Sequence, residues 1–402
     1  ANRQSKQKTT TSISTKKGKM HRKIRNCHPK SKQIENYPNL NIDMNVFSQL
    51  KEEIPVPNTA RTIKRKNEYE IVPLSSRVSE KHSVNLLQKV SHNPLIKNGP
   101  ISPESAKQKY SLLLNAYEIE EIDEFQDIYF LGVNEVKIHP NKTGASNYGY
   151  DDRFHHYKAK IGDHIAYRFE IRSILGKGAF GQVLRCIDHK TNDLVALKMI
   201  VNTPVMREQG KTEASILQFL NEAEGHEESG ILQCTDYFIF RNHICLTSEI
   251  LGLNLYDMSK KMHFKPFAMS KVRGIAKDIL IGLDFIHSHS IVHCDIKPEN
   301  ILLCPEGKKK AKIIDFGSSC VIGEQKFEYI QSRYYRAPEV ILGLEYGPPM
   351  DIWSFSCIIA EMLLGRPLFS GDNEEEQMSN YMEVFGRPPK ELIDNCSRRK
   401  HF

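Results

Sequence analysis

The chain has 402 residues with a formal net charge of +7, and 40% of its residues are hydrophobic, enough for at least one sizeable core. The charge is uneven, because residues 1–66 hold 16 Lys and Arg against four acidic residues, so their balance is +12 and the other 336 residues sum to −5. These properties exclude a uniformly basic globule, and no apolar run reaches the roughly 20 residues that a membrane helix needs.

The nine cysteines are scattered from Cys27 to Cys396, with no C-x-x-C pair and an odd total. This spacing predicts neither a disulfide framework nor a zinc site, and it fits a reduced intracellular compartment. The N-terminus is polar and basic without an apolar core, so it does not have the form of a secretory signal. We therefore expect a cytoplasmic and/or nuclear protein with no membrane partner.

Residues 1–100 are rich in Lys, Ser, Thr, Asn and Pro. Such a composition cannot bury enough apolar surface to offset chain entropy, so we predict a basic, largely disordered N-terminal region. Its basic clusters at 16–25 and 61–66 fit nuclear-import signals or contacts with polyanions. A solvated charged tail is the commoner explanation of such runs.

An ordered accessory segment is predicted at 101–168. Ser102 and Pro103 have the pattern of a helix N-cap and first helical position. The apolar side chains of Leu112, Leu113, Leu114 and Tyr117 follow, and we expect them to lie in the same helix.

After this segment strands come first and helices later, which favours an α+β fold of two lobes with a cleft between them. Apolar patterns bounded by turn residues predict strands at 169–175, 182–187 and 194–201. Apolar residues at i, i+3, i+4 spacing then predict a helix that buries Val272, Ile275, Ala276, Ile279, Leu280, Leu283 and Ile286. A second helix is predicted at 350–364.

A glycine-rich stretch at 176–183, GKGAFGQV, fits the pattern G-x-G-x-x-G-x-V between the first two strands. Glycines let such a turn close over phosphates, because any side chain would block the approach of the backbone. Alone the pattern also fits dinucleotide-binding loops and ordinary turns. A dinucleotide loop opens a helix, however, and here a strand follows.

Lys198 lies fifteen residues beyond Val183, in the apolar strand sequence VALK. A buried lysine is costly unless a partner fixes its charge, and the alternative is a strand-edge lysine whose amine reaches water. Glu213, in a helix-like stretch, is the candidate partner, and the pair would hold Lys198 on the α- and β-phosphates of ATP. Three further glutamates compete for this role, namely Glu208, Glu222 and Glu224.

Residues 293–300, HCDIKPEN, match H-x-D-x-x-x-x-N. In that pattern Asp295 orients the substrate hydroxyl and accepts its proton, Lys297 stabilises the transferring charge, and Asn300 binds the second Mg²⁺. Asp315 of the D-F-G sequence is an expected Mg²⁺ ligand, and A-P-E follows at 337–339. Chance poorly explains so many motifs in this order, so the sequence predicts a protein kinase that uses ATP and Mg²⁺.

From about residue 100 to its end, the sequence resembles the second class of the dual-specificity tyrosine-regulated kinases (DYRK), in the CMGC group of protein kinases. Cys294 replaces the usual Arg of the catalytic loop, as in that family. Residues 329–343, YIQSRYYRAPEVILG, follow its activation segment, and residues 117–132 follow its homology box. The resemblance implies a two-lobed protein kinase fold, with an antiparallel β-rich N-lobe, a helical C-lobe and a kinase domain at 169–402.

The resemblance implies that Tyr329 is autophosphorylated in cis, and that phosphate is then transferred to Ser and Thr of protein substrates. The CMGC resemblance further implies a proline after the phosphoacceptor. Because residue 294 is not a cation, a phosphate on Tyr329 needs other partners, and Arg333 and Arg336 are close in sequence.

Three positions depart from the family pattern. Ser248 stands at the gatekeeper position, where the family has a large aromatic residue, which predicts a deeper pocket beside adenine. Ser356 replaces a glycine, which predicts either strain or a tolerated small residue. The chain ends at Phe402, before the family's final helices, so we expect a truncated C-lobe in which Glu339 lacks its arginine partner.

The predicted ATP-binding set joins the glycine-rich turn, the strand lysine with its partner, and the hinge between the lobes. Its members are Gly176, Lys177, Gly178, Ala179, Phe180, Gly181, Val183, Ala196, Lys198, Glu213, Ser248, Glu249, Ile250 and Leu251.

Two other functions compete with an active kinase. A catalytically impaired, truncated kinase that acts as a scaffold or regulator is the alternative that the missing helices suggest. Nucleic-acid binding is supported only by the charge of the tail, so no nucleic-acid partner is expected.

Overall fold

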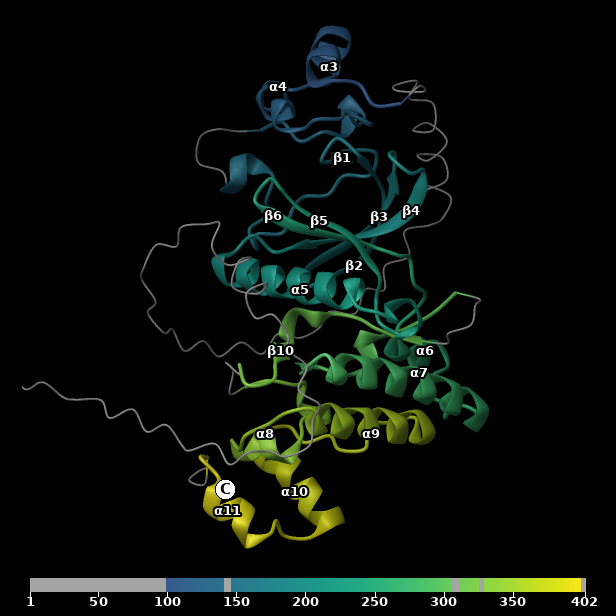
Figure 1. Ribbon diagram of the computed structural model, residues 1–402, viewed down its shortest axis with the longest axis vertical. Helices are drawn as coiled ribbons and strands as arrows, with labels where there is room; N and C mark the ends of the chain where they lie inside the picture. Colours follow the sequence, from purple (N-terminus) through teal and green to yellow (C-terminus); the bar gives the residue numbers. More distant parts are fainter. Residues whose placement is uncertain (1–98, 141–145, 306–310, 325–328, 399–402) are drawn as a thin grey trace, which may run out of the picture. The chain divides into compact units, whose positions relative to one another are not determined.

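The computed structural model describes residues 99–140, 146–305, 311–324 and 329–398. A six-stranded antiparallel sheet forms an N-lobe, and helices dominate the C-lobe (Figure 1). This arrangement confirms the predicted α+β, two-lobed kinase fold. The predicted disordered region and its two basic clusters lie outside the described residues.

The N-lobe sheet has the strand order β1-β2-β3-β4-β6-β5. The glycine-rich turn joins β2 to β3, with Gly178 opposite Gly181 in the register. The predicted strands match β2, β3 and β4, although β2 continues three residues further, into the turn. The six strands are β1 (His164–Ile165), β2 (Phe169–Gly178), β3 (Gly181–Asp188), β4 (Asp193–Ile200), β5 (Cys234–Phe240) and β6 (His243–Ser248).

Helix α5 (Pro204–Glu222) lies next to this sheet and contacts β4, β5 and β6 (Figure 1). The hydroxyl of Thr203 accepts a hydrogen bond from the N–H of Met206, and Pro204 takes the first helical position, so the helix start is well defined. The buried face of α5 includes Ala214, Ile216, Leu217 and Leu220, together with the carboxylate of Glu213. Packing of these apolar residues therefore fixes the position of Glu213.

The accessory segment begins as predicted, with Ser102 as the N-cap of α3 (Pro103–Tyr110). The expectation that this helix continues through residue 117 is wrong. The chain leaves α3 through one 3₁₀ turn, and α4 (Ala116–Glu121) starts afresh. Asn115 is the N-cap of α4, because its side chain accepts hydrogen bonds from the N–H groups of Tyr117 and Glu118 in a capping box.

A buried polar network ties α4 to the sheet. Arg241, in the turn between β5 and β6, donates hydrogen bonds to Glu121 and to the hydroxyl of Tyr157. Glu118 lies 2.7 Å from Lys137 Nζ and 3.0 Å from His164 Nε2, and all three side chains are buried. Because each buried charge has an opposite charge beside it, the network joins the accessory segment to the N-lobe without an uncompensated ion.

The C-lobe is built around α7 and α9, which contact each other. Two short antiparallel ribbons, β7 with β10 and β8 with β9, lie between the helical part and the N-lobe. The helices are α6 (Leu255–Lys261), α7 (Met269–Ser288), α8 (Pro338–Leu342), α9 (Pro349–Leu364), α10 (Glu374–Phe385) and α11 (Lys390–Asn395), and the short strands are β7 (Ile291–Val292), β8 (Ile301–Leu303), β9 (Ala311–Ile313) and β10 (Cys320–Val321).

Helix α7 buries most of the face that the sequence predicted. The exceptions are Ala276, which is half-buried, and Leu280, which is 43% exposed. Eight helical residues turn through about 800°, so Leu280 lies about 80° from Val272, at the edge of the apolar face. The predicted helix at 350–364 matches α9.

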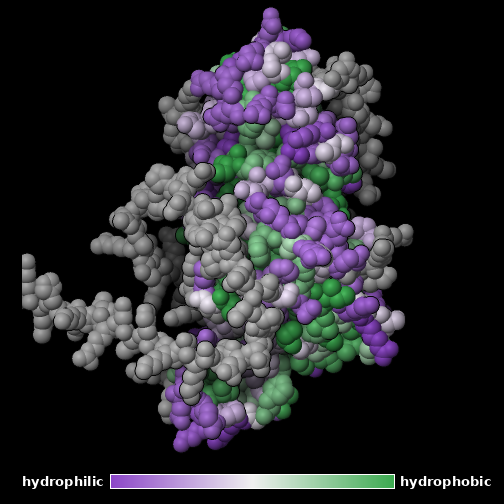
Figure 2. Space-filling view, in the orientation of Figure 1, coloured by the Kyte–Doolittle hydropathy of each residue, from purple (hydrophilic) through white to green (hydrophobic). Residues whose placement is uncertain are grey.

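No helix among the described residues is both long enough and apolar enough to cross a membrane. In Figure 2 the surface of the accessory segment is mostly polar, whereas apolar surface gathers over the C-lobe helices. Exposed apolar side chains on those helices include Leu280, Leu363 and Leu364.

Candidate active site

The glycines of the turn between β2 and β3 serve two different purposes. A Cβ atom added to Gly176 or Gly178 would meet nothing within 4 Å, so both face open space. A Cβ atom added to Gly181 would collide with the carbonyl oxygen of Met199 on β4. Gly181 is therefore required by packing, while Gly176 and Gly178 leave a cradle free for phosphate groups.

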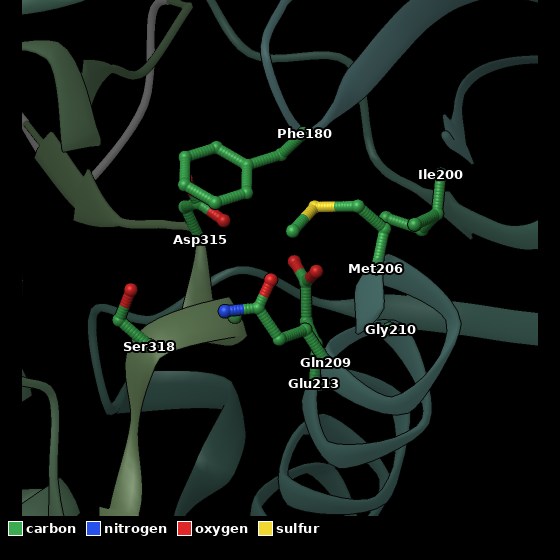
Figure 3. A pocket seen from close by; sticks show the side chains of 9 residues that line it. Phe180, Ile200, Met206, Gln209, Gly210, Glu213, Asp315 and Ser318 are labelled. Carbon is green, nitrogen blue, oxygen red and sulfur yellow. The ribbon is translucent and has the colours of Figure 1, made fainter. Parts of the chain in front are cut away.

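The three side chains of this turn lie in different surroundings. Lys177 extends to Asp152 of the accessory segment, and its Nζ atom lies 2.8 Å from the Asp152 carboxylate. Ala179 is exposed at the tip of the turn. Phe180 lines a small pocket beside Asp315, with Met206 and Gln209 of α5 on another side (Figure 3). Lys177 was predicted to bind ATP, and that role stays a prediction.

Lys198 lies between two carboxylates. Its Nζ atom is 2.6 Å from Glu213 Oε1 and 2.8 Å from Asp315 Oδ1. Burial disfavours the charge of Lys198, but Asp315 and Glu213 outweigh it and raise the pKa of the amine. Glu208 and Glu222 have other partners on α5.

The two carboxylates beside Lys198 differ in their protonation behaviour. Burial raises the pKa of Glu213, although Lys198 opposes that rise. Burial also acts to raise the pKa of Asp315, but the charge of Lys198 and its hydrogen bond lower it overall. The aspartate is thus held in the charged form, which is the form that a magnesium ion requires.

Asp315 has a left-handed backbone, with φ 67° and ψ 75°. The next residue, Phe316, is fully buried and meets the ring of His293 edge-on at 5.1 Å between ring centroids. A non-glycine residue in this region is strained, and packing of Phe316 maintains it. The buried ring therefore directs the Asp315 carboxylate toward Lys198 and the cradle.

The catalytic loop brings three predicted residues together. Lys297 Nζ is 2.6 Å from Asp295 Oδ2, and the amide of Asn300 donates to the carbonyl of Asp295 at 2.9 Å. Burial acts to lower the pKa of Lys297, but Asp295 outweighs it and raises that pKa. A cation, a carboxylate and an amide thus meet at one point, which suits transfer of a phosphoryl group to a hydroxyl.

Sequence reasoning overlooked Ser332 at this point. Its hydroxyl donates to Asp295 Oδ1 at 2.9 Å and lies 3.3 Å from Lys297 Nζ. Ser332 therefore links the activation segment to the catalytic loop. Its position directly after Gln331, within the activation-segment motif, was the only signal for it in the sequence.

Asp351, at the start of α9, was also overlooked as a functional residue. Its carboxylate is fully buried and accepts hydrogen bonds from the N–H groups of His293 and Cys294, at 2.8 and 3.0 Å. His287 Nε2 lies 2.9 Å from it. Asp351 thus holds the start of the catalytic loop on the central helix of the C-lobe.

Ser356, on the same helix, causes no strain. It is exposed, and its hydroxyl donates to the carbonyl of Ile352 at 2.8 Å. A serine that bonds one turn back is readily accommodated in a helix. Of the two expected consequences, a tolerated small residue is the one that the structure shows.

The hinge residues follow β6. Ser248, the last residue of β6, is buried and pairs with Ala196 of β4. The side chain of Glu249 lies 2.5 Å from Lys312, which leaves its backbone as the part available to a ligand. Ile250 and Leu251 are half-buried. The deeper pocket behind Ser248 stays a prediction.

In the activation segment, Tyr329 is 66% exposed and its ring lies 4.0 Å from the guanidinium carbon of Arg336. Arg333 instead donates to the carbonyl of Asp372 at 2.6 Å. The structure therefore brings only Arg336 of the predicted pair against Tyr329. Glu339 is half-buried, and burial raises its pKa; among the described residues it forms no ion pair.

The family profile described as the protein kinase domain matches residues 169–399. The chain is 48% identical over 291 residues to the DYRK-family kinase pom1 of Schizosaccharomyces pombe, an alignment that covers 72% of this chain and 27% of the relative. It is 43% identical over 330 residues to dual specificity tyrosine-phosphorylation-regulated kinase 3 of Homo sapiens, covering 82% of this chain and 56% of the relative.

A third relative, dual specificity tyrosine-phosphorylation-regulated kinase 2 of Drosophila melanogaster, is 44% identical over 308 residues, covering 76% of this chain and 43% of the relative. The chain thus spans only part of the length of these relatives. The sequence matches, the two lobes and the site residues all indicate the same family. The chain belongs to the protein kinase family and, within the CMGC group, to the dual-specificity tyrosine-regulated kinases.

Proposed function

We propose that this chain is an ATP-dependent dual-specificity protein kinase, which phosphorylates Ser and Thr of protein substrates and autophosphorylates Tyr329. The observation that carries the proposal is the position of Lys198 between Glu213 and Asp315, beside an assembled Asp295, Lys297 and Asn300 group. Family membership supports the same conclusion.

The residues present fit ATP and Mg²⁺. The open space over Gly176 and Gly178 suits phosphate groups, and the oxygens of Asp315 and Asn300 suit a hard divalent cation. When bound, Mg²⁺ would neutralise charge on the phosphates. In the proposed reaction the substrate hydroxyl gives its proton to Asp295 while its oxygen bonds to the γ-phosphorus. The bond between that phosphorus and the bridging oxygen breaks, and ADP leaves.

A preference for proline after the phosphoacceptor has support in the backbone of Gln331. This residue has φ 63°, and its carbonyl oxygen accepts hydrogen bonds from Arg336 Nε and Nη2, at 3.3 and 2.6 Å. That carbonyl is therefore already hydrogen-bonded to Arg336 and does not accept a hydrogen bond from a substrate N–H. Because proline lacks an N–H, it loses nothing at this position.

The test is transfer of labelled γ-phosphate from Mg·ATP to a peptide with a Ser-Pro site, with mass spectrometry of residue 329. We expect transfer and phosphorylated Tyr329 in the wild type, and a loss of both by at least about a thousandfold in Asp295→Asn. Asp284→Asn, the same change on the exposed side of α7, serves as the control. Folded wild-type protein without transfer would instead favour the impaired scaffold.

We further propose that the protein works in the cytoplasm, the nucleus or both, without a membrane partner. The mildly acidic balance of residues 67–402 and the basic clusters of the tail support this location. Fluorescence microscopy of the tagged chain, with and without the basic cluster at 61–66, tests it. Loss of the nuclear fluorescence when this cluster is deleted would support a nuclear-import signal.

A further inference from the structure

Three arginines converge on the start of α10. Arg333 donates to the carbonyl of Asp372, just before the helix. Arg336 Nη1 is 2.7 Å from Glu374 Oε1, and Arg398 Nη1 is 3.1 Å from the same oxygen. Arg398 also donates to the second oxygen of this carboxylate, through Nη2. We call Arg336, Glu374 and Arg398 the arginine–glutamate cluster.

The position of Arg398 is fixed by the segment that follows α11. Cys396 Sγ and Ser397 Oγ donate to the carbonyls of Leu342 and Gly343, each at 2.7 Å. Gly343 has φ +69°, and a Cβ atom there would collide with Ser397 and Arg398. The segment therefore packs closely on the end of α8, next to the activation segment, and holds the guanidinium group of Arg398 in place.

The cluster has more positive than negative charge. Two guanidinium groups share one carboxylate, a sum of +2 and −1, and the side chains are only 3%, 17% and 26% exposed for Arg336, Glu374 and Arg398. Burial acts to raise the pKa of Glu374, but its hydrogen bonds to the two arginines lower it overall. The ring of Tyr329 lies directly against Arg336, so an anion on that ring would adjoin this excess positive charge.

The two arginines differ in the donors that they have left. Arg336 already uses Nε and Nη2 on the carbonyl of Gln331 and Nη1 on Glu374. In contrast, Nε of Arg398 donates no hydrogen bond within the described residues, and this side chain is the most exposed of the cluster. The hydrogen bond to Glu374, with a smaller contribution from Tyr329, raises the pKa of Arg398, so its charge is permanent.

We propose that Arg398, together with Arg336, receives the phosphate of phosphorylated Tyr329, and that Glu374 occupies this site while Tyr329 is unmodified. The inference depends on the proposed function in one respect, since autophosphorylation is the expected source of the phosphate. A phosphotyrosine carries about two negative charges at neutral pH and forms strong charge-assisted hydrogen bonds with arginine. Phosphorylation thus replaces a shared carboxylate by a stronger anion and connects the activation segment to the segment that follows α11.

The experiment uses the full chain with phosphotyrosine installed at position 329 by genetic-code expansion, in the inactive Lys198→Met background. The rate at which a tyrosine phosphatase removes this phosphate is compared among variants. We expect removal to be about tenfold faster in Arg398→Ala than in the Lys198→Met parent, and intermediate in Arg398→Lys. In Glu374→Gln the phosphatase should remove the phosphate more slowly than in the Lys198→Met parent, because the competing carboxylate is gone.

Arg387→Ala removes an exposed arginine after α10 and is the matched control, with an unchanged rate expected. Melting temperatures of the phosphorylated and unphosphorylated forms are compared within each variant, so a general loss of stability cancels. Equal removal rates in Arg398→Ala and Arg387→Ala, or an unchanged rate in Glu374→Gln, would overturn the inference. Because the phosphate is installed, this result is independent of whether the chain modifies Tyr329 itself, which the unaltered protein tests.

Discussion

Asp351 shows how one buried carboxylate organises the catalytic loop. It accepts two backbone hydrogen bonds from residues 293 and 294, the residues that immediately precede Asp295. A buried backbone N–H group that loses its hydrogen-bond acceptor destabilises the folded state. The position of Asp295 therefore depends on a residue 56 positions later in the chain.

Replacement of Asp351 by asparagine should lower the free energy of unfolding by about 2–4 kcal/mol, because an amide cannot accept both hydrogen bonds. Activity should fall with it, since the loop that holds Asp295 loses its anchor. Urea denaturation and peptide phosphorylation measure the two effects. Asp284→Asn should change the free energy of unfolding by no more than about 0.5 kcal/mol, and the phosphorylation rate by no more than the factor to which that energy corresponds. A stable but inactive Asp351→Asn would show that the role of Asp351 is limited to catalysis.

Glu118 is the corresponding residue in the accessory segment. Burial acts to raise its pKa, but His164 and Lys137 outweigh it and hold the pKa well below its usual range. A carboxylate with a lowered pKa stabilises the folded state above its unfolded pKa of about 4.5, and this contribution decreases as the pH falls toward the folded pKa.

We therefore expect Glu118→Gln to be less stable than the wild type at pH 7, by about 2–4 kcal/mol, because it leaves buried cations without a counter-charge. The difference should shrink steadily as the pH falls below about 4.5. Free energies of unfolding between pH 7 and pH 3 check this. Glu124→Gln, on the exposed side of the same segment, is the control. A difference that stays constant across this range would contradict the account.

At the scale of elements, the accessory segment supports the glycine-rich turn. Asp152 pairs with Lys177 at 2.8 Å. Burial acts to raise the pKa of Asp152, but the hydrogen bond from Lys177 and two backbone hydrogen bonds lower it to about 2. Nearby, the side chain of Gln182 donates to the carbonyl of Tyr157 at 2.6 Å. The glycine-rich turn is thus connected to a segment outside the kinase profile.

Removing this ion pair with Asp152→Asn should raise the KM for ATP by about two- to fivefold and leave kcat nearly unchanged. Because the ion pair is partly exposed, it stabilises the conformation of the turn by no more than about 1 kcal/mol. Steady-state kinetics at varied ATP concentration measure it. Asp123→Asn breaks a pair of similar exposure with Lys107, far from the turn, and should have no effect. An unchanged KM in Asp152→Asn would mean that the turn does not need this support.

Element boundaries show where sequence patterns succeed and fail. The strands β2 to β4 and the helices α7 and α9 were predictable, because their apolar periodicity is long and regular. The break between α3 and α4 was missed, because three consecutive leucines suggested a continuous helix. The capping box of Asn115 and Glu118 prevails over that pattern, and Leu112 is left 89% exposed.

At the scale of the whole molecule, the site joins the two lobes. Lys198 and Glu213 come from the N-lobe, and Asp315 comes from the C-lobe. A ligand that contacts all three stabilises the folded chain by an amount that depends on its concentration relative to its dissociation constant.

Mg·ATP at a hundred times its dissociation constant should therefore stabilise the protein by about 2.7 kcal/mol, measured as a rise of several degrees in the melting temperature. Lys198→Met should lose most of this rise, because its amine is positioned for the phosphates. Lys277→Met, on the exposed side of α7, should keep it. A wild type that shows no shift would refute nucleotide binding, whatever its fold.

The chemistry of the site was predictable because kinase motifs are short and local. Asp295, Lys297 and Asn300 lie within six residues, so their spacing alone brings them together. Glu213 was correctly chosen as the partner of Lys198, but three other glutamates still competed, since helix periodicity does not show which side chain points at a strand. Lys177 was assigned to ATP by its motif, and nothing in the sequence revealed the distant Asp152 that pairs with it.

By itself the sequence determined the family, the fold and the set of groups available for phosphoryl transfer, because these follow from residue types at short, fixed spacings. Only the tertiary structure decided which groups meet across long stretches of chain. Asp351 beneath the catalytic loop, Asp152 beside Lys177, and Arg398 in the cluster near Tyr329 all depend on the packing of elements that are far apart in sequence. Such contacts arise from burial of apolar faces, and local patterns do not record which faces pack together.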